Sequence, residues 1–186
     1  MAESKITIEK FKDIFLYAVT KEDGKYIKYV TNSGFTLCVK NAMMKLAEEC
    51  GADYQPEYYS VDHTFWTNFN AENKANADEV HMSNWKWNLL ALIEHENNPN
   101  DWNYEVLKLA PFHCPLRVVI GYRNTKVDDE ARLQYVSGLL RSMKENACFC
   151  EDGDFWIVIG NCGHDEADYV FYKYDCDEGG FVRKAV

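Results

Sequence analysis

The feature of the sequence that most constrains its fold is a run of five apolar residues followed at once by three ionisable ones. The apolar run covers residues 89–93, and Glu94, His95 and Glu96 follow it. Continuous apolar residues are typical of a strand that is buried on both faces of a sheet, so we expect the acidic residues at the rim of that sheet. Because side chains alternate along a strand, Glu94 and Glu96 should share one face and His95 the other.

A second segment with the composition of a strand carries another acidic residue. Residues 57–66 are rich in Tyr, Val, Thr, Phe and Trp, as strands are, and Asp62 lies among them. If the two strands are neighbours, Asp62, Glu94 and Glu96 form a small oxygen-rich pocket. Carboxylates are the ligands that hard divalent cations prefer. The sequence therefore predicts a Mg²⁺ or Mn²⁺ site at these three residues, with the His95 carbonyl as a further candidate ligand.

This order of features resembles the PD-(D/E)xK nuclease superfamily. A strand with an Asp is followed by a strand ending in Glu-x-Glu, then by a helical pattern, then by the apolar strand 116–122. The resemblance covers residues 34–123 and implies a restriction-endonuclease-like fold and metal-dependent hydrolysis of phosphodiesters. By this match Asp62 takes the first acidic position and Glu94 the second. Glu96 stands where the family most often has Lys, and Val61 stands where it has Pro.

The absent motif lysine draws attention to the helical pattern at residues 102–109. The resemblance implies that Lys108 supplies the missing cation from this helix, as in divergent members of such families, with Glu105 one turn earlier to orient it. The alternative is an ordinary exposed Glu–Lys helix pair. Glu96 would then act as a general base or as another metal ligand. The candidate catalytic residues are Asp62, Glu94, Glu96 and Lys108.

Strand and helix patterns alternate along the chain and predict one α/β domain over residues 1–186, with a central mixed sheet flanked by helices. A Gly, Asn or Asp cluster separates most of the elements. The polar excursion at 68–84 is longer than most connections, and such loops are often functional. Strands are expected within 4–31 and at 57–66, 85–96, 116–122, 155–159 and 169–174, and helices at 35–50, at 102–109 and from Asp128 onward.

The composition is that of a folded, acidic chain. Hydrophobic residues make up 47% of the 186 residues and aromatic residues 15%, which excludes a disordered protein. No apolar stretch approaches the roughly 18 residues that span a membrane, and the N-terminus lacks the apolar core of a signal peptide. Seven cysteines without such a signal favour reduced thiols and a cytoplasmic protein.

The distribution of charge bears on nucleic-acid binding, which relies on Lys and Arg. The net charge of -10 argues against a general nucleic-acid coat. Residues 145–180, however, hold ten acidic groups and one lysine, whereas residues 117–144 hold six basic groups and three acidic ones. We therefore expect 145–180 to form a peripheral acidic hairpin away from any nucleic acid. The excess of basic groups in 117–144 is compatible with a basic surface near the carboxylates.

Cysteine and histidine near the C-terminus invite a zinc interpretation, because both are common zinc ligands. Cys148 and Cys150 precede the expected strand 155–159, and Cys162 and His164 follow it. A strand of this length separates the two pairs by roughly 15–20 Å. One shared site is therefore excluded if the strand forms, and structural or incidental cysteines are favoured.

Two functions of different classes agree with these patterns. The first is a Mg²⁺-dependent nuclease that cuts DNA or RNA, with a homodimer as a further expectation from the resemblance. The alternative is a catalytically inactive protein of the same fold that binds or neutralises a protein partner, which would fit the net acidity and the aromatic residues Trp85, Trp87 and Trp102. Convergence of the Asp62 and Glu94 carboxylates beside a basic groove would favour the nuclease.

Overall fold

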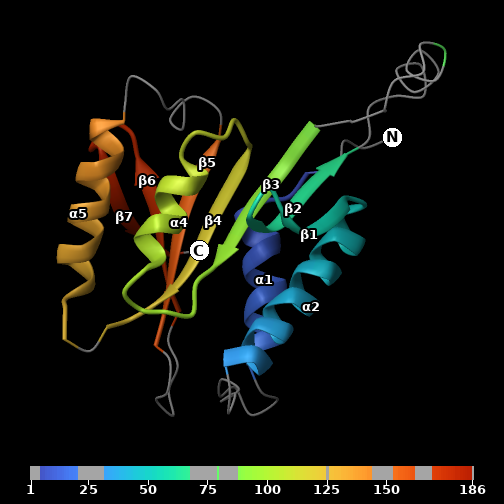
Figure 1. Cartoon of the computed structure of the whole chain (residues 1–186), viewed down its shortest axis with the longest axis horizontal. Coiled ribbons are helices and arrows are strands. Elements are labelled where there is room, and N and C mark those ends of the chain that lie inside the picture. Colours follow the sequence, from blue (N-terminus) through green and yellow to red (C-terminus); the bar gives the residue numbers. More distant parts are fainter. Residues whose placement is uncertain are drawn as a thin grey trace.

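The computed structural model describes residues 5–20, 32–67, 79, 88–124, 126–143, 153–161 and 169–185. These residues form one seven-stranded mixed sheet between two layers of helices (Figure 1). The strands lie side by side in chain order: β1 (Asp53–Tyr58), β2 (Val61–Thr67), β3 (Asn88–His95), β4 (Leu116–Tyr122), β5 (Asp154–Gly160), β6 (Tyr169–Asp175) and β7 (Gly180–Lys184). The central strands β3, β4 and β5 are parallel, and every other neighbouring pair is antiparallel. The predicted α/β class with a mixed sheet is confirmed.

The described part of the chain contains four helices, two on each face of the sheet. Helices α1 (Ile8–Val19) and α2 (Asn32–Cys50) share one apolar core with residues from alternate positions of the strands. Helices α4 (Trp102–Leu109) and α5 (Asp129–Ser142) share a second core with the intervening strand positions. Side-chain alternation thus divides each central strand between the two layers.

The prediction of strands within residues 4–31 is wrong for residues 8–19, which form α1. Its buried residues recur at helical spacing: Ile8, Phe11, Ile14, Phe15 and Val19. The hydroxyl oxygen of Thr7 accepts a hydrogen bond from the Lys10 backbone N–H at 3.3 Å and caps the first turn. The alternation of Ile6 and Ile8, which indicated a strand, therefore spans this cap. The expected turn at 21–25 and the return strand lie outside the described residues.

The predicted strand at 57–66 is two strands joined by a tight turn. Glu57, Tyr59 and Ser60 have positive φ angles of 54°, 49° and 62°, so the chain reverses between β1 and β2. Such angles are uncommon outside glycine and asparagine, which is why the residue types did not indicate a turn. The reversal places the Ser60 carbonyl next to the start of β2, where Asp62 lies.

The acidic segment 145–180 is only partly peripheral. Its first strand, β5, lies between β4 and β6 rather than at the edge, and residues 155–160 are buried. The prediction of a peripheral hairpin is wrong for this strand, because its apolar side chains belong to the core. The predicted pairing of β5 with β6 is confirmed. The flanking residues 144–152 and 162–168 lie outside the described part.

The cysteines agree only in part with the expectation of reduced thiols. Cys38, Cys50 and Cys114 are free, whereas Cys176 takes part in a disulfide bond. The residues considered for zinc, Cys148, Cys150, Cys162 and His164, lie outside the described part of the chain, as do Trp85 and Trp87. None of the described helices is long and apolar enough to cross a membrane.

Two buried histidines lie on the side of the sheet that α1 and α2 cover. The His95 ring nitrogen Nε2 is 2.7 Å from the Tyr122 hydroxyl, and the His63 Nδ1 is 2.9 Å from the Tyr54 hydroxyl. Burial lowers the pKa of His63 to about 3 and that of His95 to about 4. Both imidazoles are therefore neutral in the folded protein at neutral pH, while in the unfolded chain they gain a proton near pH 6.5.

These histidines should make the fold sensitive to acid. Below pH 6.5 the unfolded chain binds protons that the folded chain excludes, so the free energy of unfolding falls as the pH falls. We expect on the order of 1–2 kcal/mol per histidine between pH 7.5 and pH 5. The measurement is urea unfolding of the parent and of the double variant His63→Asn, His95→Gln at both pH values. The parent should lose more stability than the variant as the pH falls. Equal losses in the two proteins would contradict the prediction, because they would mean that His63 and His95 are protonated as readily in the folded state as in the unfolded state.

Candidate active site

Asp62 and Glu94 face each other across two neighbouring strands. β2 and β3 pair in an antiparallel register that places His63 opposite Ile93. The His95 N–H donates to Asp62 Oδ2 at 2.9 Å, and the Asp62 N–H lies 3.4 Å from Glu94 Oε2. The predicted adjacency of the two strands is confirmed, and the two carboxyl groups converge.

The convergence is electrostatically costly because the site is buried. The Glu94 side chain is 1% exposed, and burial raises its pKa to about 9, against the effect of a hydrogen bond from Lys108. The pKa of Asp62 is also raised, again chiefly by burial. Burial thus favours the protonated forms of both carboxyl groups, and the nearby ammonium of Lys108 opposes this effect for Glu94.

Lys108 brings a cation into this site from helix α4. Its Nζ lies 2.8 Å from Glu94 Oε1 and donates to the Ser60 carbonyl at 2.8 Å. It also forms an ion pair with Glu105 one turn earlier. Burial disfavours the ammonium form, but the hydrogen bonds to Glu105 and Glu94 outweigh this effect and raise the pKa of Lys108. The Lys108 side chain is 30% exposed and that of Glu105 18%, so the pair is not an ordinary exposed helix pair.

The position of Lys108 follows from how α4 packs. Trp102, Val106 and Leu109 form the buried stripe of this helix, and Trp102 presses on Gly121 of β4. A Cβ atom on Gly121 would lie 2.7 Å from the Trp102 Cγ, so only glycine admits the indole here. With this stripe against the sheet, Lys108 falls on the flank of α4 from which its Nζ reaches Glu94 of β3.

Glu96 is not brought together with the other two carboxylates. β3 ends at His95, and the Glu96 side chain turns into the following loop, where its Oε1 accepts from the Asn98 N–H at 2.6 Å. The prediction that Glu96 lies beside Glu94 is wrong because side-chain alternation applies only within the strand, and Glu96 follows its last residue. The same argument is correct for His95, whose ring contacts Tyr122 and Phe35 on the opposite face.

Two of the described basic residues in 117–144 are held by contacts within the protein. Arg117 is fully buried, and its guanidinium donates to the carbonyls of Phe112 and Gly153. Arg123 forms an ion pair with Asp129 at 2.7 Å. Lys144 lies outside the described residues. Arg117 and Arg123 therefore hold a loop and a helix end in place, whereas Lys126 and Arg141 are exposed.

Two carboxylates, not three, are available for a cation. Within the described ranges no three His, Cys, Asp or Glu side chains gather closely enough to hold a metal ion. Asp62 and Glu94 nevertheless fit Mg²⁺ chemically, because they are oxygen donors from neighbouring strands that lie close together. Mg²⁺ is commonly held by one or two carboxylates together with water and substrate phosphate.

Comparisons with family models, with curated proteins and with solved structures find no match to this chain. The interpretation of the site therefore depends on its own geometry: two converging buried carboxyl groups and one lysine from an adjacent helix.

A bound divalent cation should stabilise the folded protein. At a concentration near ten times its dissociation constant it would add about 1.4 kcal/mol, which raises the melting temperature by about 3–6 °C for a chain of this size. Because the cation replaces a proton on Glu94, the gain should be larger at pH 8.5 than at pH 6. The measurement is thermal unfolding with and without millimolar Mg²⁺ or Mn²⁺.

Four variants assign this gain to particular residues. Asp62→Asn and Glu94→Gln should remove most of it, since each lacks one of the two converging carboxylates. Glu96→Gln and His95→Ala should keep it, because those side chains point away from the pair. An unchanged melting temperature of the parent protein in both metals would contradict a cation site.

Proposed function

We propose that the protein is a metal-dependent nuclease of the PD-(D/E)xK type, with a restriction-endonuclease-like fold, that hydrolyses phosphodiester bonds of DNA or RNA. The observation that carries the proposal is the ion pair between Lys108 and the buried Glu94, beside Asp62. This pair supplies the cation that the Glu-x-Glu sequence lacks.

The order of elements supports the proposal. Asp62 lies on β2, Glu94 lies near the end of β3, α4 follows, and β4 returns parallel to β3. This is the order in which the superfamily arranges its acidic residues, its helix and its apolar strand. The two acidic residues lie on neighbouring strands of one sheet, as the proposal requires.

Each residue has a defined task in this chemistry. Asp62 and Glu94 would hold a Mg²⁺ or Mn²⁺ ion, which when bound activates water and offsets charge on the phosphorus centre. Lys108 presents a protonated amine to the same place, and it can donate to a non-bridging phosphate oxygen as negative charge develops there. Glu105 keeps this amine charged and directed toward the carboxylates.

One observation favours the alternative, an inactive protein of the same architecture that binds a protein partner. The net charge is -10, and the guanidinium groups of Arg117 and Arg123 bond to other groups of the protein. A surface of this kind suits a basic protein better than a long duplex. Cleavage activity distinguishes the two functions.

The test is a cleavage assay on single-stranded and duplex DNA and RNA, with Mg²⁺ or Mn²⁺. We expect metal-dependent cleavage by the parent protein and a decrease of about 10²–10³-fold for Lys108→Met, the usual range for loss of a group that stabilises transition-state charge. Asp62→Asn should be at least as severe. Lys45→Met is the matched control, because Lys45 lies on α2 and pairs with Glu49.

Absence of cleavage of all four substrates by folded parent protein would contradict the nuclease. If cleavage occurs but Lys108→Met retains it, then Lys108 and Glu105 are structural and another group supplies the cation.

A further inference from the structure

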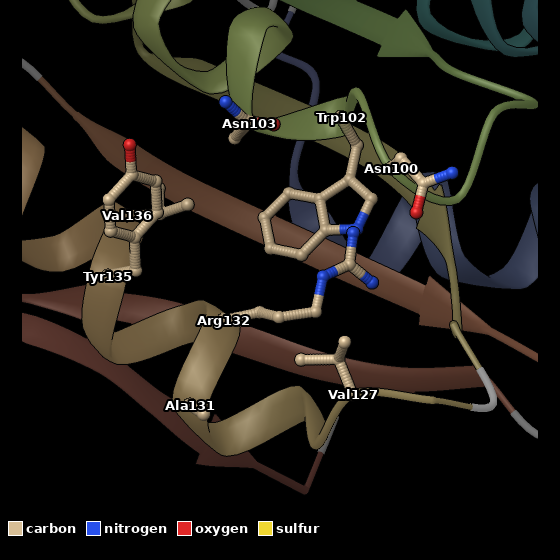
Figure 2. A pocket seen from close by; sticks show the side chains of 8 residues that line it. All are labelled: Asn100, Trp102, Asn103, Val127, Ala131, Arg132, Tyr135 and Val136. Atoms are coloured by element: carbon tan, nitrogen blue, oxygen red, sulfur yellow. The ribbon is translucent and has the colours of Figure 1, made fainter.

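A cavity of about 300 Å³ lies between the start of α4 and helix α5. It is at the lower end of the size range of small-molecule sites. Figure 2 shows Trp102 and Asn103 from α4 facing Arg132, Tyr135 and Val136 from α5. The cavity and Lys108 therefore lie on opposite flanks of α4, since Lys108 contacts β3 and the turn before β2.

Arg132 forms a flat cationic wall of this cavity. Its guanidinium lies over the Trp102 ring, 4.5 Å from the centroid, and donates to the carbonyls of Tyr122 and Pro99. These contacts fix the plane of the guanidinium without neutralising it, and no ion pair of Arg132 occurs among the described residues. A fixed guanidinium plane attracts anions and also stacks on nucleobases.

The other walls supply a second aromatic ring and amide groups. Tyr135 follows Arg132 by one helical turn and is 62% exposed, so its ring is available for stacking. Asn103 contributes an amide whose donor and acceptor match the edge of a base. The Trp102 Nε1–H is buried and has no hydrogen-bond partner within the described residues. Val127, Ala131 and Val136 provide apolar surface.

We propose that this cavity binds a nucleobase of a single-stranded nucleic acid. A planar group fits between Tyr135 and the Arg132–Trp102 stack, polar base edges match the amides, and the attached phosphate is drawn to the guanidinium. Trp102 and Lys108 are six residues apart, about 9 Å along the helix axis. That rise corresponds to two or three stacked nucleotides, taking 3.4 Å for each.

The path between the two places crosses the outer side of α4. Tyr104 lies there and is 65% exposed, and an exposed aromatic ring is a stacking surface for a base along this path. The inference rests on the proposed function in one respect: the base in the cavity would belong to the strand whose phosphodiester reaches Lys108. The binding itself requires no catalysis.

The experiment measures binding of a fluorescein-labelled ten-nucleotide single-stranded DNA by anisotropy, in EDTA and with the Asp62→Asn protein, so that nothing is cleaved. Tyr135→Ala and Asn103→Ala should each raise the dissociation constant, by roughly tenfold for the tyrosine, as loss of one stacked base does. Tyr17→Ala is the matched control: Tyr17 is 76% exposed and lies on α1, across the sheet. An oligonucleotide of the same length with abasic positions should bind as weakly to the parent as the intact one binds to Tyr135→Ala.

The proposal is overturned if the oligonucleotide does not bind, if Tyr135→Ala binds as tightly as Tyr17→Ala, or if the abasic strand binds as tightly as the intact one. Failure of the proposed function is separate. Cavity-dependent binding by a parent protein that cuts nothing would remove the nuclease and keep the cavity site. Metal-dependent cleavage with no effect of Tyr135→Ala on binding would overturn the cavity site and keep the nuclease.

Discussion

Burial of the Glu94 carboxyl is the constraint on which the arrangement of the site depends. An isolated carboxylate in the protein interior is strongly disfavoured, so this side chain requires a proton or a cation at all times. The structure meets the requirement with the Lys108 ammonium and with the Asp62 N–H. An apolar residue at the same strand position would be easier to bury. A sequence that keeps the acid there departs from the rule of the apolar core, and such departures concentrate at functional sites.

The pairing at the centre of the site could be predicted because two local patterns agreed. The apolar run 89–93 indicated a buried strand, and alternation placed Glu94 and His95 on opposite faces, as they are. Prediction failed where a pattern was extended beyond the element that carried it. Glu96 was assigned a face although β3 ends at His95. The composition of residues 57–66 predicts one strand, because the turn between β1 and β2 uses positive φ angles at Tyr59 and Ser60 and contains no Gly, Asn or Asp.

The role of Lys108 shows a different limit of sequence analysis. The spacing of Glu105 and Lys108 fits a surface helix pair and an active-site pair equally well, because both need only three residues of separation. What separates the two is burial, and burial depends on residues far away in the chain. Gly121 on β4 admits the Trp102 indole, which settles α4 on the sheet and turns Lys108 toward Glu94. The contact between α4 and β4, which follows it in the chain, thus determines which side chain of α4 reaches Glu94 on β3, which precedes it.

Helix α4 therefore holds two sets of groups in a fixed relation. Trp102 anchors its first turn between Gly121 and the Arg132 guanidinium, and Lys108 anchors its last turn to β3 and to the Ser60 carbonyl. The helix has only eight residues, too few to be stable alone in water, so these contacts and not its intrinsic propensity determine where it lies. A ligand that displaced Arg132 from Trp102 would loosen the first turn, and the same rigid segment would carry that change to Lys108. The cavity and the carboxylates are consequently in contact with the same short helix, so a shift of α4 at Trp102 would also shift Lys108 at Glu94.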